Sequence, residues 1–355
     1  MRSILPIKSR VSRSTQLLLT TLICAAFFIK SPYVILSPGD PQNILGSAIT
    51  ISGTQVFPTT GKLSVTSVMV TDPDSYITGF DVLYSWLDPD RAVLPRVEVY
   101  PEDETPEQSM KMGAQEMADS QLNATAAALK YLGYELSSKL IIGQVNEQSN
   151  AFNVLKIGDE LLSVDNFKYD SQSELASELN QKNPGDRVIV RVLRAGTNII
   201  EEQIKLSARD DGSAFIGIGL RNQFDFPFDV KIRLAETGGP SGGLIFALGV
   251  IDKLTKEDLV RSRNIAGTGT ITQDGQVGPI GGIAEKIIGA NKAGVELFFT
   301  PIRNCAELGD IDQILTGNAK EKMKIVPIAT LSQAVSILRS PDTAQYPSCK
   351  STSWE

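Results

Sequence analysis

The 355-residue sequence contains no histidine, the base that most serine and cysteine hydrolases use and the commonest zinc ligand. Its three cysteines, Cys24, Cys305 and Cys349, are too scattered for a CxxC-type metal site. Cys305 and Cys349 could form a disulfide in an oxidising compartment, but sequence leaves open whether their Cα atoms lie close enough. Any hydrolase built on this chain needs another base, and we expect no metal and no cofactor.

Basic patches and phosphate loops are missing as well. The net charge of -7 and a pI near 5.0 give no footprint for nucleic acid. No G-x-x-x-x-G-K-[ST] motif occurs, so we expect no ATP binding. A metal hydrolase using Asp72, Asp74, Asp88 and Asp90 is an alternative, but Asp-Pro-Asp pairs are typical of solvated turns.

A basic and then apolar segment opens the chain. Four basic residues precede the apolar run 17–29, and a second apolar patch, 33–36, follows Lys30-Ser31-Pro32; the four are Arg2, Lys8, Arg10 and Arg13. The two patches together have about the twenty residues that cross a bilayer. We expect a cytoplasmic tail over 1–15 and an uncleaved transmembrane anchor over 16–36, with the later domains outside the cytoplasm. A cleaved signal peptide is the alternative.

Two regions with different sequence patterns follow the expected anchor. From 40 to 100 the sequence predicts strands, including one over 63–68 with period-two alternation, and a helix over about 106–130 that stops at Gly133. Between 134 and 208, short strands surround one short helix over 171–181. This section resembles a PDZ domain through residues 155–165 (LKIGDELLSVD) and the Pro184-Gly185-Asp186 turn.

PDZ domains bind extended peptides at a sheet edge, with backbone amides holding the terminal carboxylate. The matching loop is Tyr131-Leu132-Gly133-Tyr134, which we expect to bind peptide. A plain helix stop is an equally good interpretation of these four residues.

Ser241 opens an apolar helix after an expected strand over 228–234, within the segment TGGPSGGLIFAL. A serine in this position is usually an N-cap. Here glycines flank it, including Gly239 and Gly242, and they let a substrate approach the backbone closely. The free N–H groups of a helix N-terminus suit a developing oxyanion. Ser241 is therefore a candidate nucleophile.

Lys286 lies in a second glycine-rich segment, GPIGGIAEKIIGA, which predicts a turn and a helix over 278–290. Ile283, Lys286, Ile287 and Ala290 follow i, i+3, i+4, i+7 spacing, so the lysine shares an apolar stripe, whereas Glu285 is expected to point elsewhere. Loss of water around an ammonium lowers its pKa from about 10.4 toward the range where the amine is a base. Lys286 could thus replace the missing histidine.

These two segments, together with GTGTIT at 267–272, resemble the proteolytic domain of Lon peptidases. The resemblance implies that Ser241 and Lys286 form a Ser–Lys dyad and that Thr268 hydrogen-bonds the lysine. It also implies self-association, since Lon-type domains commonly form rings. Two positions depart from the Lon pattern: Gly238 stands where Lon has an acidic residue, and Gly242 replaces an alanine.

The expected fold is α+β: a Lon-type proteolytic domain interrupted by a β-barrel-like PDZ domain and preceded by one transmembrane helix. The expected parts are the proteolytic domain over 40–132 and 212–342, the PDZ domain over 133–208, and a C-terminal tail over 343–355. Protein or peptide substrates and a membrane are the expected partners, without ATP. The alternative is a catalytically silent PDZ scaffold at the membrane.

Overall fold

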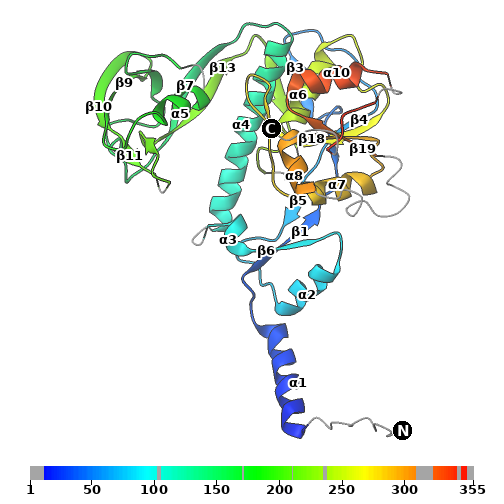
Figure 1. Cartoon of the computed structure of the whole chain (residues 1–355). Coiled ribbons are helices and arrows are strands. Elements are labelled where there is room, and N and C mark those ends of the chain that lie inside the picture. Colours follow the sequence, from blue (N-terminus) through cyan, green and yellow to red (C-terminus); the bar gives the residue numbers. More distant parts are fainter. Residues whose placement is uncertain are drawn as a thin grey trace, which may run out of the picture.

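A computed structural model describes residues 12–101, 105–169, 172–209, 211–234, 238–308, 323–341 and 345–349. The basic residues Arg2, Lys8 and Arg10 and most of the expected C-terminal tail lie outside these ranges. Figure 1 shows a helix projecting from a central body and a second β-rich body on the far side of a long helix.

The projecting helix is α1 (Arg13–Phe28), whose first turn is capped by the Ser12 side chain. The chain then turns extended at Ile29, and Pro32 precedes strand β1 (Tyr33–Pro38). Val34, Ile35 and Leu36 are buried in that strand. The expected continuous anchor over 16–36 is thus wrong in its second half, because those apolar residues serve a sheet. Within the described ranges, no helix is long and apolar enough to cross a membrane.

Strand β1 is the centre of a small antiparallel sheet of order β5-β1-β6. Its neighbours are β5 (Val68–Val70) and β6 (Ala92–Pro95), and helices α2 (Gly79–Leu87) and α3 (Arg96–Val99) lie in the same part of the chain. The strand expected over 63–68 is wrong as a single strand. It divides into β4 (Lys62–Val65) and β5, which belong to different sheets.

The larger body is built on a five-stranded sheet of order β19-β18-β15-β4-β2, in which β19, β18, β15 and β4 are parallel. Its strands are β2 (Gln42–Asn43), β4, β15 (Asn264–Gly267), β18 (Leu297–Pro301) and β19 (Lys324–Ile328). Around it lie α4 (Pro106–Tyr131), α6 (Gly243–Leu254), α7 (Ile283–Lys292), η1 (Ile302–Asn304), α8 (Cys305–Leu308) and α10 (Leu331–Arg339). Two strand pairs complete it: β3 (Ile49–Ser52) with β14 (Asp229–Ile232), and β16 (Thr270–Ile271) with β17 (Val277–Gly278).

Helix α6 runs through the core of this body, and every residue from Gly243 to Asp252 is buried. Helix α4 packs against it through a stripe of small residues that includes Ser120, Ala124 and Ala127. The expected helix over 106–130 is confirmed. Cys305 and Cys349 form a disulfide, with their Cα atoms 5.3 Å apart.

The inserted domain has a sheet of order β10-β9-β8-β7-β13 and its own buried core. Its elements are β7 (Ser137–Val145), β8 (Glu160–Val164), α5 (Gln172–Leu179), β9 (Arg187–Arg194), β10 (Asn198–Lys205), β11 (Ser207–Ala208), β12 (Ala214–Phe215) and β13 (Ile218–Asp225). Strand β13 pairs with β7 along its length, from Ile218 opposite Val145 to Asp225 opposite Ser137. The inserted domain thus runs to Asp225 and not to 208, because its sheet needs this last strand.

Candidate active site

Ser241 lies in the turn directly before α6, and two bonds from α4 hold that turn. The Gly239 amide donates to the carbonyl of Gly113 (3.0 Å), and the Ser120 hydroxyl donates to the carbonyl of Pro240 (2.9 Å). Gly239 has a φ of +86°, a conformation that favours glycine. The turn carrying Ser241 is thus fixed by a helix that precedes it by more than a hundred residues.

Thr268 directly follows β15 and holds the backbone of Ser241 through a hydrogen bond. Its hydroxyl donates to the Ser241 carbonyl (3.0 Å), and the Gly269 amide donates to the same oxygen (2.7 Å). Thr268 is fully buried, and its own amide donates to the carbonyl of Phe299 on the adjacent β18. The sheet therefore fixes the position of the Thr268 oxygen.

Lys286 lies in the first turns of α7, on the buried stripe formed by Ile283, Ile287 and Ala290, as the sequence indicated. Only 4% of Lys286 is exposed, and burial lowers the pKa of its ammonium to about 8. Its Nζ donates to Thr268 Oγ1 (3.2 Å). Glu285, which is expected to point away from this stripe, is also buried.

Ser241 and Lys286 line one open cavity of about 640 Å³. Its walls come from the turn between β1 and β2, from strand β5, and from the two glycine-rich segments; they are Gly39, Asp40, Gln42, Ser67, Val68, Met69, Val70, Gly238, Ser241, Gly281 and Lys286. Strand β5 is an edge strand, so one side of its backbone has no neighbouring strand in the described sheet. The cavity thus brings together a hydroxyl, a buried amine and an unpaired strand edge.

The two departures from the Lon pattern have local explanations. At Gly242, a Cβ atom would lie 2.6 Å from Phe246 Cζ and 2.9 Å from Val65 Cγ2, so the Phe246 ring fills the space an alanine would need. At Gly238 the acidic group is absent, but Asp40 brings a carboxylate to the same cavity from a distant part of the chain.

The expected backbone donors for an oxyanion need one correction. The Gly239 amide is already bonded to Gly113, so it is not available to a substrate oxygen. The Leu244 amide donates to the Gly269 carbonyl (3.1 Å), so the better candidates are the amides of Ser241, Gly242 and Gly243 at the start of α6, where the first N–H groups have no partner within the helix.

Tyr131, Leu132, Gly133 and Tyr134 form the stop of α4. Gly133 has a φ of +88°, and the Tyr134 amide donates back to the Leu129 carbonyl (3.0 Å). Tyr131 and Leu132 pack on the core of the larger body. The structure therefore favours the helix-stop interpretation of these four residues over peptide binding.

The cleft of the inserted domain lies instead between α5 and the edge strand β13. A cavity of about 150 Å³ there is lined by apolar side chains, among them Leu175, Leu179, Phe215, Ile216 and Leu220. A second cavity of about 500 Å³ continues from it onto α4 and the turn after β16. The alternating glycines and apolar residues of the sequence FIGIGL at 215–220 are the signal that sequence reasoning missed.

Two of the four aspartates weighed as metal ligands pair with basic residues. Asp88 pairs with Arg91 (3.1 Å) and Asp90 with Lys292. In the part of the chain that the structure describes, no group of three or more histidine, cysteine, aspartate or glutamate residues is arranged to hold a metal ion.

A serine at a helix start, a buried lysine of lowered pKa and a threonine bonded to both are the groups that a serine hydrolase with a lysine base would need. Comparison with known proteins agrees with this class. Residues 223–339 match the Lon protease (S16) C-terminal proteolytic domain, and residues 115–205 match the PDZ domain. Over these two stretches the chain is therefore similar to the proteolytic domain of Lon proteases and to a PDZ domain.

Similar curated proteins are Lon proteases. That of Mesomycoplasma hyopneumoniae is 40% identical over 95 residues, which cover 27% of this chain and 10% of that protein. That of Rhizobium meliloti is 27% identical over 155 residues, covering 42% and 18%. The chain spans about a quarter or less of the length of these relatives. Among solved structures, the PDZ domain of the SdrC-like protein from Listeria monocytogenes is 28% identical and covers 23% of this chain and 85% of that one, with a TM-score of 0.22.

Proposed function

We propose that this protein is a membrane-bound, ATP-independent serine endopeptidase in which Ser241 is the nucleophile and Lys286 the general base. The observation that carries the proposal is the burial of Lys286, whose pKa of about 8 leaves a useful fraction of neutral amine near physiological pH. Neutral Lys286 takes the proton from Ser241 Oγ as that oxygen attacks a peptide carbonyl. The N–H groups at the start of α6 stabilise the resulting oxyanion.

In this mechanism Thr268 is a positioning residue. Its hydroxyl proton is engaged by the Ser241 carbonyl, so its lone pairs face the amine of Lys286. Among the described residues, the Lys286 amine is bonded to Thr268 and not to Ser241 Oγ. Catalytic hydrogen bonds of this kind often tighten only when substrate is bound.

The proposed substrates are flexible or partly unfolded protein segments. The exposed edge of β5 beside the cavity can accept an extended peptide as an added strand, which a folded helix or domain could not supply. The sequence has no ATP-binding loop for an unfolding motor. The cleft between α5 and β13 is the proposed PDZ site for a second peptide segment.

Two features support placement at the outer face of a membrane. Helix α1 follows a basic segment and exposes apolar side chains, including Leu17, Leu18, Leu22 and Ile23. The Cys305–Cys349 disulfide fits an oxidising compartment outside the cytoplasm. Self-association is proposed from the Lon resemblance alone.

The test compares cleavage of an unfolded protein such as casein, without ATP, by wild type, Ser241→Ala and Lys286→Ala. Each variant should abolish cleavage, and the double variant should cost little more, because the two residues act as one unit. Folded Lys286→Ala protein with near-wild-type activity would rule out the dyad. Wild type that neither cleaves nor reacts with a serine-directed probe would favour the silent scaffold.

A further inference from the structure

Helix α2 turns its polar side toward the protein and its apolar side outward. Ser85 is 1% exposed, and its hydroxyl has no hydrogen-bond partner among the described residues. Five large apolar side chains on the opposite side are 47% to 75% exposed: Phe80, Leu83, Tyr84, Trp86 and Leu87. A surface helix in water normally has the reverse arrangement.

The chemistry of this face suits lipid. The one charged residue of α2 is Asp81, and its carboxylate accepts bonds from the amide and hydroxyl of Thr78 in a capping box. The outward face therefore carries no charge, and it includes a tryptophan and a tyrosine, which are enriched where a membrane meets water. The Arg91 guanidinium lies 5.6 Å from the Tyr84 ring and places a cation at the rim.

The face is continuous with the apolar surface of α1. The Phe27 and Phe80 rings are stacked, with centroids 4.9 Å apart, and Gly79 allows α2 to begin against the carbonyl of Ala26. Lys30 and Thr78 form a backbone bridge between the two segments. Figure 1 shows α2 beside the end of α1 that is nearest to the body. Two helices thus present one apolar surface from fixed relative positions.

We propose that α2 is an interfacial helix, with the face from Phe80 to Leu87 inserted among lipid headgroups and the adjoining acyl chains. This inference rests on the membrane association proposed above. Helix α2 lies between β5 and β6 in the chain, and β5 lines the cavity of Ser241 and Lys286. The proteolytic site is therefore held close to the bilayer, where it meets the membrane-proximal segments of its substrates.

Fluorescence of Trp86 tests the proposal in the full chain. The sequence has two tryptophans, so Trp354→Phe leaves Trp86 as the single reporter. The protein is reconstituted into phosphatidylcholine and phosphatidylglycerol vesicles and exposed to brominated lipids or to aqueous acrylamide. Brominated lipids should quench Trp86 several-fold more than they quench the reporter of a Tyr134→Trp variant in a background that lacks both Trp86 and Trp354. Quenching by acrylamide alone would overturn the proposal.

Further variants distinguish insertion of α2 into lipid from membrane association through α1. A Leu22→Trp reporter on α1, in a background lacking both native tryptophans, measures membrane association itself. If it is quenched by brominated lipid while Trp86 is not, only the role of α2 is wrong. Leu87→Glu should abolish lipid quenching of Trp86, and Ile157→Glu, at a side chain with the same 71% exposure on the inserted domain, should leave it unchanged. Protection of Trp86 from both quenchers would mean that another protein surface covers α2, which also overturns the proposal. Casein cleavage measured in parallel tests the dyad separately.

Discussion

Burial alone lowers the pKa of Lys286, and the proposed mechanism therefore predicts a defined pH dependence of cleavage. The amine must be neutral to accept the Ser241 proton, so kcat/KM should rise with pH along one limb with its midpoint near 8, the pKa of Lys286. An exposed lysine would place the midpoint near 10. The measurement is a pH profile of a peptide substrate between about pH 6 and pH 10.

The matched variant is Lys286→Arg, which keeps the charge and removes the base, because a guanidinium does not lose its proton in this range. It should be nearly as inactive as Lys286→Ala at every pH. A normal profile from the arginine variant would contradict the assignment of Lys286 as base.

Gly242 is predicted to be intolerant of the alanine that Lon peptidases carry. A Cβ at this position would lie 2.6 Å from Phe246 Cζ, and the Phe246 ring is fully buried. Gly242→Ala should lower the free energy of unfolding by about 1–3 kcal/mol, the usual cost of overpacking. Combining it with Phe246→Leu should cost less than the sum of the two single variants, measured by urea denaturation. Strict additivity would mean that the two residues do not compete for space.

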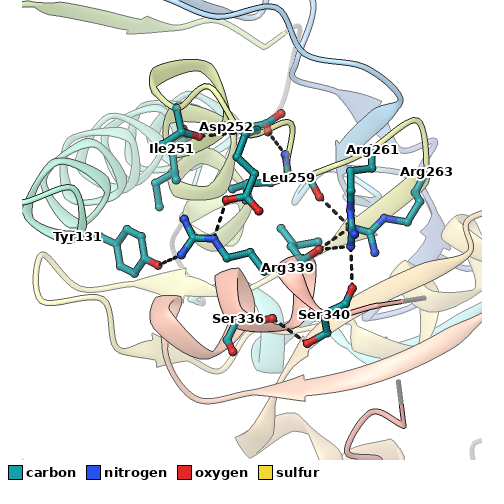
Figure 2. Close-up of polar contacts among 12 residues, drawn as sticks. Tyr131, Ile251, Asp252, Leu259, Arg261, Arg263, Ser336, Arg339 and Ser340 are labelled. Atoms are coloured by element: carbon teal, nitrogen blue, oxygen red, sulfur yellow. Dashed lines mark hydrogen bonds and ion pairs between the residues drawn. The ribbon is translucent and has the colours of Figure 1, made fainter. Parts of the chain in front are cut away.

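Asp252, in the last turn of α6, makes stability depend on pH. Its Oδ1 accepts a bond from the Leu259 amide (2.6 Å), as Figure 2 shows, and its Oδ2 has no partner among the described residues. Burial raises the pKa of this carboxyl from 3.8 to about 6. The folded state therefore holds this proton more tightly, so the contribution of Asp252 to stability is fully present below pH 3.8 and is lost as pH rises through 6. The loss amounts to up to about 3 kcal/mol.

Asp252→Asn removes the titrating charge and keeps an acceptor for Leu259. Denaturation curves between about pH 4 and pH 8 should show that the gap between the variant and wild type grows with pH in favour of the variant. A constant gap would mean that the carboxyl titrates normally. At the same end of the body, Arg339 donates hydrogen bonds to Glu257 and to the Tyr131 hydroxyl.

Helix α4 holds the turn that carries Ser241, the proposed nucleophile. Ser120→Ala removes the bond to the Pro240 carbonyl and leaves a poorly exposed oxygen unpaired, a loss of about 1–3 kcal/mol. We expect a lower kcat with little change in KM, because the turn carrying Ser241 loses its support. Gly113→Ala is the control: its Cβ would lie 3.6 Å from Gly238 Cα, an ordinary contact. That variant should keep activity and gain up to about 1 kcal/mol from helix propensity. Equal kcat for both variants would contradict this role of Ser120.

The sequence predicted the elements whose pattern is local. Helix α4, the buried stripe of α7 and the serine before α6 follow from spacing and from glycine placement. The sequence did not predict that residues 33–36 leave the expected anchor, since an apolar run reads alike in a membrane helix and in a buried strand. It also missed Asp40 and Ser120, because their approach to the cavity depends on contacts between distant parts of the chain. The reversed polarity of α2 was hidden for the same reason: burial of Ser85 is decided by its neighbours.

At the scale of the whole molecule, the inserted domain is predicted to be removable. Ser137 and Asp225 are paired across β7 and β13, so a short Gly/Ser linker can replace the segment between them. The shortened protein should stay folded and react with a serine-directed probe. The deletion would expose the part of α4 that β13 covers, including Asn123, which accepts a hydrogen bond from Asn222. Unfolding of the shortened protein, measured by circular dichroism, would mean that the two bodies fold only together.

The same pairing of Ser137 with Asp225 influences the order in which the protein folds. Strands β4 and β15 are parallel neighbours, but the chain reaches β15 only after passing through the whole inserted domain. Once that domain has folded, its ends are adjacent, and it shortens the loop that must close; each halving of a loop saves about 0.6 kcal/mol. Chains are synthesised from the N-terminus, so the inserted domain is complete before Ser241, Thr268 and Lys286 leave the ribosome. In the proposed function, the active site then assembles only after the inserted domain has folded, so the growing chain has no active peptidase while that domain is still unfolded.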